Sequence, residues 1–302
     1  MQNDHELSGA DPEPASTGRG IPWIILATFL FVTMDAIVKA LLQDGYQLVQ
    51  VVWGRYFFHF LLLLIVFLPK LRIVCLSQNF TLQLLRSILL LMTTSLFFSG
   101  LQFVPLAEAS AIMLISPLIV TALAMPILKE PVGPRRWTGV AIGFIGALII
   151  IRPGSELISL GILFPAAAAI CFAIYQISTR LLSQADPITT TLFYTAFLGA
   201  IFTSIAAPFY WTPPTSGAWS LMIMTGLCGG LGHFSLIKAF TLSPASVISP
   251  YGYLNLIWAL LLGFLLFSEV PNTWSIVGAV IITSSGLYVY HRERNQNSSK
   301  LT

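Results

Sequence analysis

The sequence predicts an all-α integral membrane protein with ten transmembrane helices, arranged as two inverted five-helix repeats. Its composition is 56% hydrophobic and only 9% charged, whereas ordinary soluble domains carry about 25% charged residues. Ten apolar segments, most of them near the roughly 20 residues that a helix needs to cross a bilayer, run along the chain. The second half also repeats landmarks of the first half at a constant offset of 139 residues.

The ten segments divide equally between a first repeat, residues 21–152, and a second repeat, residues 159–290. The expected spans of the first repeat are 21–43, 46–68, 80–102, 106–128 and 136–151. Those of the second repeat are 159–182, 188–207, 217–241, 245–267 and 274–290. Residues 1–20 are acidic and rich in Pro, Ser and Gly, without the basic start of a signal peptide, so they predict a disordered cytoplasmic tail. Residues 291–302 predict a second cytoplasmic tail.

The repeat is clearest around the fourth and fifth spans of each half. The landmarks of the first half and their counterparts are Pro105 and Pro244, Ser110 and Ser249, Glu130 and Glu269, and Gly139 and Gly278. The connector that follows Glu130 is basic, whereas the one that follows Glu269 has lost its Lys and Arg. An odd number of spans per unit inverts the second unit, so the positive-inside rule accounts for this loss. Duplicated, inverted units are typical of transporters.

Basic residues are distributed unevenly over the two membrane faces. With the amino terminus inside, the external connectors hold only Arg152 and Lys39. The cytoplasmic side collects Arg19, Lys70, Arg72, Lys129, Arg135, Arg136, Arg180, Lys238, Arg292, Arg294 and Lys300. We therefore expect a multi-pass protein of the plasma membrane, the inner membrane of a bacterium, with both termini in the cytoplasm. The basic residues act as topological anchors, and no nucleic-acid partner is expected.

Little in the sequence favours an enzyme. Cys75, Cys171 and Cys228 are far apart and lack metal-ligand spacing, so we expect no disulfide, metal or cofactor. The connectors are too short for a soluble catalytic domain. An intramembrane enzyme that uses His59, His233 and a carboxylate is the alternative, but no catalytic spacing supports it.

Three motifs carry a resemblance to a known family. They are an Arg early in the second span (Trp53-Gly54-Arg55-Tyr56-Phe57), the Ala-Ser-Ala run that ends at Pro117, and the Glu-then-Gly ending of each half. Over residues 21–290 the chain resembles the EamA family of the drug/metabolite transporter superfamily. The resemblance implies a ten-helix basket around a central cavity, with spans five and ten packing the halves together and with alternating access.

Two further patterns bear on the place of the chain within that superfamily. Met34-Asp35-x-x-x-Lys39 and the run 253–258 look closest to members that take up riboflavin-like or S-adenosylmethionine-like metabolites. The second half departs from the family pattern, because Asn255-Leu256 stands where the first half has Pro117. A gating role shared by both halves is therefore not implied for that proline.

Ionisable residues inside the membrane are the candidates for substrate binding, since a charge there costs a few kcal/mol. Asp35 and Lys39 lie one turn apart on the first span, and Arg55 and His59 lie one turn apart on the second. Their depths allow Asp35 to contact Arg55. The equivalent positions of the second half are Ile174, Ser178, Tyr194 and Leu198. The charged side chains inside the membrane therefore belong to the first half.

Each of these residues has two interpretations. Arg55 presents a planar fork that suits a carboxylate or phosphate, or it pairs with Asp35 and only joins two helices. His59 relays a proton, or it is a neutral histidine bonded to the backbone. Lys39 contacts substrate, or it extends to the external interface.

Aromatic and glycine residues complete the candidates. Tyr56, Tyr175 and Tyr194 are expected to line the cavity, with helix packing as the alternative. The glycine-rich run 226–232 is either a hinge or a surface for close packing. Glu130 and Glu269 recur at opposite faces, which favours capping or loop anchoring over binding.

The sequence thus predicts a secondary transporter that moves a small anionic or zwitterionic metabolite by alternating access. A broad-specificity exporter of metabolites or drugs is the alternative. The expected partners are the small-molecule substrate and the lipid bilayer, with proton coupling and a monomeric or homodimeric state left open. Substrate identity and the direction of transport also remain open at this stage.

Overall fold

The computed structural model describes residues 19–128, 134–151, 160–182, 185–243 and 249–299. All regular structure in these residues is helical. Six of the helical spans have the length and apolar composition to cross a membrane, and four shorter apolar helices accompany them. The prediction of an all-α membrane protein with ten spans is confirmed.

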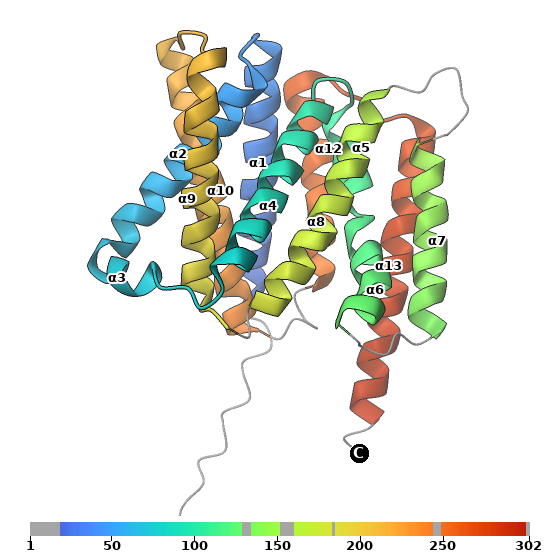
Figure 1. Cartoon of the computed structure of the whole chain (residues 1–302). Helices are drawn as coiled ribbons and strands as arrows, with labels where there is room; N and C mark the ends of the chain where they lie inside the picture. The colour runs from blue at the N-terminus through green and yellow to red at the C-terminus, as the bar shows by residue number, and fades with distance from the viewer. Residues whose placement is uncertain (1–18, 129–133, 152–159, 183–184, 244–248, 300–302) are drawn as a thin grey trace, which may run out of the picture.

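The helices follow the predicted order (Figure 1). The first half comprises α1 (Ile21–Gln43), α2 (Leu48–Phe67), η1 (Leu68–Lys70), α3 (Leu71–Val74), α4 (Phe80–Gly100), α5 (Leu106–Met113), α6 (Ser116–Leu128) and α7 (Pro134–Ile151). The second half comprises η2 (Leu160–Ile162), α8 (Leu163–Leu182), α9 (Ile188–Ala206), η3 (Ala207–Tyr210), α10 (Ser216–Leu242), η4 (Ser249–Tyr253), α12 (Leu254–Phe267) and α13 (Thr273–Ser299).

Local sequence signals fix several helix ends. The Asn79 side chain accepts the backbone N–H of Leu82 and caps α4, and Thr215 caps α10 in the same way through Ala218. Gly45 has a φ of +88°, which a residue with a side chain rarely adopts, and it turns the chain between α1 and α2. Short polar loops of this kind keep neighbouring helices antiparallel.

Two boundaries differ from the prediction. The last helix was expected to end at residue 290, but α13 continues to Ser299, so most of the expected carboxy-terminal tail is helical. The fourth span of each half is discontinuous. In the first half α5 ends at Met113 and α6 begins at Ser116, and in the second half a 3-10 helix gives way to α12 at Leu254. The expected amino-terminal tail lies almost wholly outside the described residues.

The two halves enter the bundle in opposite directions (Figure 1). We call the side on which α1 begins and α13 ends the terminal side, and the other the far side. Ser243, after the end of α10, accepts a hydrogen bond of 2.9 Å from the backbone N–H of Gly20, before the start of α1. Because α9 and α10 follow α8 in alternating directions, α8 runs from the far side to the terminal side. Its equivalent in the first half, α1, runs the other way, as an inverted repeat requires.

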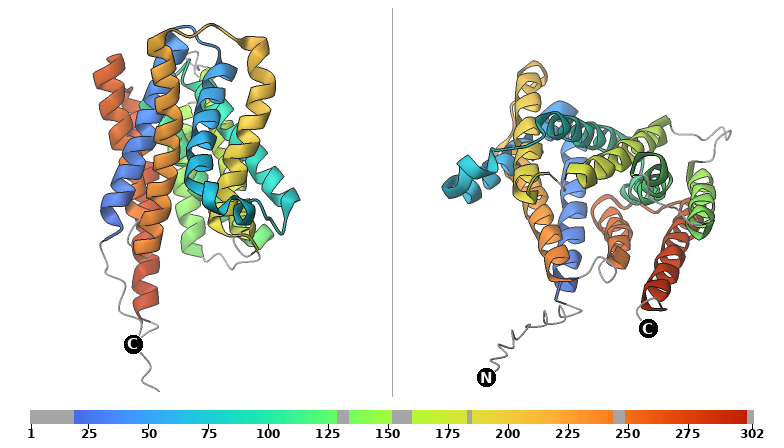
Figure 2. Two further views of the ribbon diagram at one scale, coloured as in Figure 1. Left: turned by 90° about the vertical axis from the view of Figure 1, so that its left-hand side faces the viewer. Right: turned by 60° about the horizontal axis from the view of Figure 1, so that its bottom comes forward.

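Contacts between the halves occur in symmetric pairs (Figure 2). Helix α1 packs against α10, and the equivalent helices α8 and α4 pack against each other. Helices α7 and α13 approach each other closely at two positions, which the repeat makes equivalent to each other. A Cβ on Gly278 would lie 2.6 Å from the Gly146 carbonyl oxygen, and the Ser285 hydroxyl donates to the Gly139 carbonyl at 2.6 Å. At the 139-residue offset Gly146 corresponds to Ser285 and Gly139 corresponds to Gly278, so the two contacts are equivalent and the inverted repeat is also a structural one.

Candidate functional site

Arg55 lies in the middle of α2 and faces the interior of the bundle. It is 7% exposed. Its Nη1 donates to the Thr94 hydroxyl of α4, and the guanidinium lies 5.2 Å from the Tyr56 ring centroid and 5.5 Å from that of Phe98. Its buried Nε has no hydrogen-bond partner. Among the described residues no carboxylate forms an ion pair with Arg55, so its positive charge is held by one hydroxyl and two aromatic faces.

Asp35 lies on α1, within electrostatic reach of Arg55. The expected Asp35–Arg55 contact is not an ion pair, because none within 4.0 Å joins them. The Asp35 side chain is half-buried and has no hydrogen-bond or ion-pair partner among the described residues. The structure therefore brings Asp35 and Arg55 to one region of the interior without bonding them to each other.

His59 lies one turn from Arg55 and is 4% exposed. Its ring is stacked on that of His233 from α10, with centroids 5.7 Å apart and planes 10° from parallel. The Nε2 atom of His59 has no partner. The bond from His59 to a backbone carbonyl that we considered as an alternative is absent from the described contacts. His233, which the sequence suggested only for the enzyme alternative, thus joins the first-half cluster from the second half.

Arg86 on α4 is a second buried arginine, 5% exposed, that sequence analysis did not place in the site. Side chains of the second half accept hydrogen bonds from the Arg86 guanidinium. Its Nε donates to Thr179 at 2.7 Å, its Nη2 donates to the Tyr175 hydroxyl at 2.5 Å, and its Nη1 donates to Thr195. The guanidinium also lies 4.4 Å from the Tyr175 ring centroid. A charge in the middle of an apolar helix was the available signal, but its partners lie about 90 to 110 residues away in sequence.

The three tyrosines expected at the site have different surroundings. Tyr56 is fully buried, and its hydroxyl lies 3.0 Å from Thr94 Oγ1. The Tyr56 ring packs directly against Gly199 of α9. Tyr175 contacts Arg86, as described above. Tyr194 lies elsewhere, because its hydroxyl donates to the Cys75 carbonyl at 2.7 Å in the loop that precedes α4. Tyr56 and Tyr175 thus lie beside the two arginines, and Tyr194 anchors a loop.

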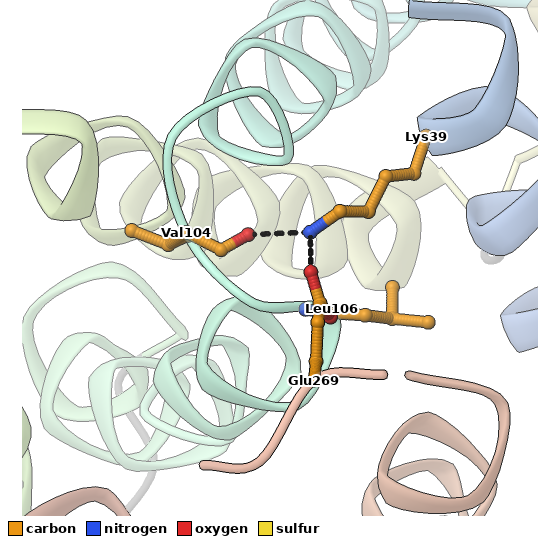
Figure 3. Close-up of polar contacts among 4 residues, drawn as sticks. All are labelled: Lys39, Val104, Leu106 and Glu269. Atoms are coloured by element: carbon orange, nitrogen blue, oxygen red, sulfur yellow. Dashed lines mark hydrogen bonds and ion pairs between the residues drawn. The ribbon is translucent and has the colours of Figure 1, made fainter. Parts of the chain in front are cut away.

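The Lys39 side chain extends toward Glu269 of the second half (Figure 3). It is 3% exposed, forms an ion pair with Glu269, and donates to the Val104 carbonyl at 2.9 Å. Glu269 also accepts the backbone N–H of Leu106 at 2.9 Å and so caps α5. Because it is buried, Lys39 does not extend to the membrane interface. It joins the two halves near the far side of the bundle.

Two other carboxylates tie the halves together. Glu108 accepts from the Asn272 amide and the Ser275 hydroxyl, both at 2.9 Å, close to the Lys39–Glu269 pair.

On the terminal side, Asp186 accepts from Ser77, from the backbone of Gln78 and from the side chain of Gln83 at 2.5 to 2.8 Å. Burial alone would raise the pKa of the Asp186 carboxyl, but these hydrogen bonds outweigh burial and hold the pKa below its ordinary value. Asp186 is thus ionised at neutral pH and binds the loop before α4 to the loop before α9.

A separate apolar pocket opens on the outside of the bundle near its far side. Its volume is about 480 Å³, and its lining includes Trp53, Phe57, Pro208 and Trp211. Trp53 donates to the Ser204 hydroxyl at 3.0 Å. Tryptophans with one polar contact are typical of the membrane interface, so Trp53 belongs to the lipid-facing surface and not to the interior cluster.

The described part of the chain contains no group of three His, Cys, Asp or Glu side chains that could hold a metal ion. The interior side chains around Arg55 and Arg86 present hydrogen-bonding groups, aromatic faces and positive charge.

Comparison with known proteins gives a family for this arrangement. The EamA-like transporter family matches the chain twice, over residues 18–152 and 159–290. These ranges coincide closely with the two repeats. The chain also superposes on a solved crystal structure with a TM-score of 0.61 at 14% identity, over 90% of this chain and 99% of the other. That likeness shows the shared fold.

Three curated relatives extend over nearly the whole chain. An S-adenosylmethionine uptake transporter of Rickettsia bellii is 30% identical over 93% of this chain and 97% of its own length. A riboflavin transporter of Rhizobium johnstonii is 28% identical over 93% and 94%. A pseudopaline exporter of Pseudomonas aeruginosa is 28% identical over 87% and 93%. All three names describe transport of a small metabolite.

Proposed function

Because this chain belongs to the EamA-like transporter family, we propose that it carries a small metabolite with an acidic group by alternating access and that Arg55 binds that group. The observation that carries the proposal is the state of Arg55. Its guanidinium is buried, has an unpartnered Nε, and lacks a carboxylate partner among the described residues. A buried charge without a counter-ion is costly, so such a charge is retained where a ligand supplies the counter-ion.

The chemistry of arginine suits this role. A guanidinium remains charged when it is desolvated and offers paired donors to a carboxylate or phosphate. Thr94 occupies only one of its terminal nitrogens in this structure. The Tyr56 and Phe98 rings beside it present faces that stabilise a cation and that pack against an apolar or planar part of a solute.

The relatives supply the first solutes to assay. S-adenosylmethionine, riboflavin and pseudopaline are the metabolites in their names, and those names include both uptake and export. We place this chain in the bacterial inner membrane, since the relatives are bacterial, with its terminal side in the cytoplasm, where the positive-inside rule puts the basic connectors.

Proton coupling has a candidate in the His59–His233 pair. The two stacked rings come from opposite halves, and His59 has an unpartnered ring nitrogen. Two imidazoles at this spacing next to Arg55 do not both accept a proton without a nearby anion, so binding of an acidic solute would favour protonation there. Proton movement that accompanies solute binding is the corresponding observable.

The test compares two variants of purified protein in lipid nanodiscs. Arg55→Gln removes the charge and keeps a polar side chain, and Lys238→Gln removes an exposed charge from α10 as the matched control. We expect both variants to insert and fold. Binding of the solute that stabilises the wild type most should weaken at least about ten-fold in Arg55→Gln, the scale of a charge-assisted hydrogen bond, and should be unchanged in Lys238→Gln. Equal binding by wild type and Arg55→Gln contradicts the assignment.

A further inference from the structure

The short stretch between α2 and α4 combines exposed apolar side chains with two exposed cations. It comprises η1, α3 and the two residues that follow, and we call it the 68–76 segment. We propose that this segment lies in the membrane interface on the terminal side and binds the headgroup of an anionic phospholipid through Lys70 and Arg72. The inference is independent of the function proposed for Arg55, because no residue of the interior takes part.

The 68–76 segment lies at the edge of the bundle on its terminal side (Figures 1 and 2). Among the six long spans of the described residues, the span Leu48–Val74 is the least buried. Only 17% of its apolar window is buried, against 39% to 44% in the other five. Within the segment Val74 alone is buried, and α3 packs against α9. The rest of the segment therefore faces away from the bundle.

Hydrogen bonds fix the end of the segment that leads to α4. Tyr194 of α9 donates to the Cys75 carbonyl at 2.7 Å. Asp186 accepts from the Ser77 hydroxyl and from the backbone N–H of Gln78, directly after the segment. The other end continues from α2. The segment is thus held in place at both ends, so a ligand that binds it does not have to order it first.

The apolar side chains of the segment favour a lipid over a soluble anion. Leu68, Ile73 and Leu76 are 64%, 68% and 73% exposed. Contact of such side chains with water is unfavourable. At the end of a membrane span they can enter the boundary between headgroups and acyl chains, as the apolar faces of interfacial helices do. The segment therefore has the character of a surface that lies in the bilayer interface.

The two cations favour an anionic lipid over a neutral one. Lys70 and Arg72 are exposed and form no ion pair among the described residues. The Asp186 carboxylate beyond the segment already accepts hydrogen bonds from Ser77, Gln78 and Gln83. A guanidinium offers paired donors to a phosphate, and an ammonium adds a point charge beside it. Basic side chains next to a bilayer attract anionic lipids, so the preference follows from charge complementarity.

Quenching of a fluorophore on the segment by labelled lipids tests the proposal. Cys75 is exposed and lies on the segment, so it takes a neutral bimane label in full-length protein that carries Cys171→Ser and Cys228→Ser. The protein is placed in phosphatidylcholine nanodiscs that contain equal fractions of brominated phosphatidylglycerol or brominated phosphatidylcholine. We expect the site to prefer phosphatidylglycerol about five-fold or more, and we expect high salt to reduce this preference.

Two variants assign the preference to the segment. Lys70→Gln combined with Arg72→Gln should bring the preference close to one, whereas Lys238→Gln, which removes an exposed cation from α10, should leave it unchanged. All these side chains are exposed, so the unfolding temperatures should match that of the labelled parent. The inference is overturned by equal quenching by the two lipids, by no quenching by either, by a preference that survives the double substitution, or by one that Lys238→Gln also abolishes.

Discussion

At the residue scale, the charges of the first half have different surroundings. Asp35 and Arg55 form no ion pair among the described residues, whereas Lys39 is bonded to Glu269 and to the Val104 carbonyl (Figure 3). Lys39 and Asp35 lie one turn apart on α1, yet only Lys39 reaches the connector that holds Glu269. The length of the lysine side chain and its position near the far end of the helix account for the difference.

The Lys39–Glu269 pair predicts a specific pattern of stability. Lys39→Met should destabilise the protein by roughly 3 kcal/mol, because it leaves the Glu269 carboxylate mostly buried without its counter-ion. The double variant Lys39→Met with Glu269→Gln should recover much of this loss, since no charge is left unpaired. Unfolding by denaturing detergent, followed by circular dichroism, measures both. A double variant that is less stable than Lys39→Met contradicts this account.

The sequence identified the unusual charges but could not identify their partners. Asp35, Arg55 and His59 were predicted because an ionisable residue in an apolar span is rare. The partners of Lys39 and Arg86 lie far along the chain, and helical depth alone does not tell which side chains meet across a bundle. Tyr194 illustrates the same limit. It was expected to line the cavity, but its hydroxyl bonds to the Cys75 carbonyl at a loop.

At the element scale, Gly226 and Gly230 of α10 form a packing surface for α2. The helix is continuous from Ser216 to Leu242, so the glycine-rich run does not interrupt it. A Cβ on Gly226 would lie 2.3 Å from Phe58 Cβ and 2.8 Å from the His59 backbone nitrogen. Gly230 faces the His59 ring in the same way. Close packing at these glycines brings His233 and Gly229 beside the candidate site.

Alanine substitutions distinguish this packing from a general effect of glycine in a helix. Gly226→Ala should lower stability by about 1 to 3 kcal/mol, because the backbone of α2 must move away. Gly217→Ala is the matched control on the same helix, since its Cβ would meet only Thr215 Oγ1 at 3.8 Å. The control should be neutral or slightly stabilising. Thermal unfolding in the same detergent tests the pair, and equal effects of the two substitutions would show that packing is not the cause.

The discontinuous fourth spans show what the sequence could and could not predict about elements. The boundaries of most helices follow from apolar segments and their flanking polar residues, and they agree with the structure within a few residues. The break between Met113 and Ser116 and the change of helix type at Leu254 were not predicted. They occur at equivalent positions, and each has a proline nearby, Pro117 in α6 and Pro250 in η4.

At the scale of the whole molecule, the halves are interleaved. Each half contributes helices that pack mainly against the other half, as α1 does against α10 and α4 does against α8. The 139-residue offset can be read from the sequence, so the inverted symmetry could be predicted. The interleaving could not be predicted, because it depends on which helix faces become buried. The candidate site lies within this interleaved region, so movement of either half changes its surroundings.

The central claim, that this bundle moves an acidic or zwitterionic solute through a site at Arg55, is tested most directly by counterflow. Proteoliposomes that contain wild type or Arg55→Gln are loaded with the solute that binds the wild type most tightly, and accumulation of its radiolabelled form is followed. We predict that wild type accumulates chemically unchanged label and that Arg55→Gln matches protein-free liposomes. Equal accumulation by the two proteins, or recovery of a chemically altered product, would contradict the claim.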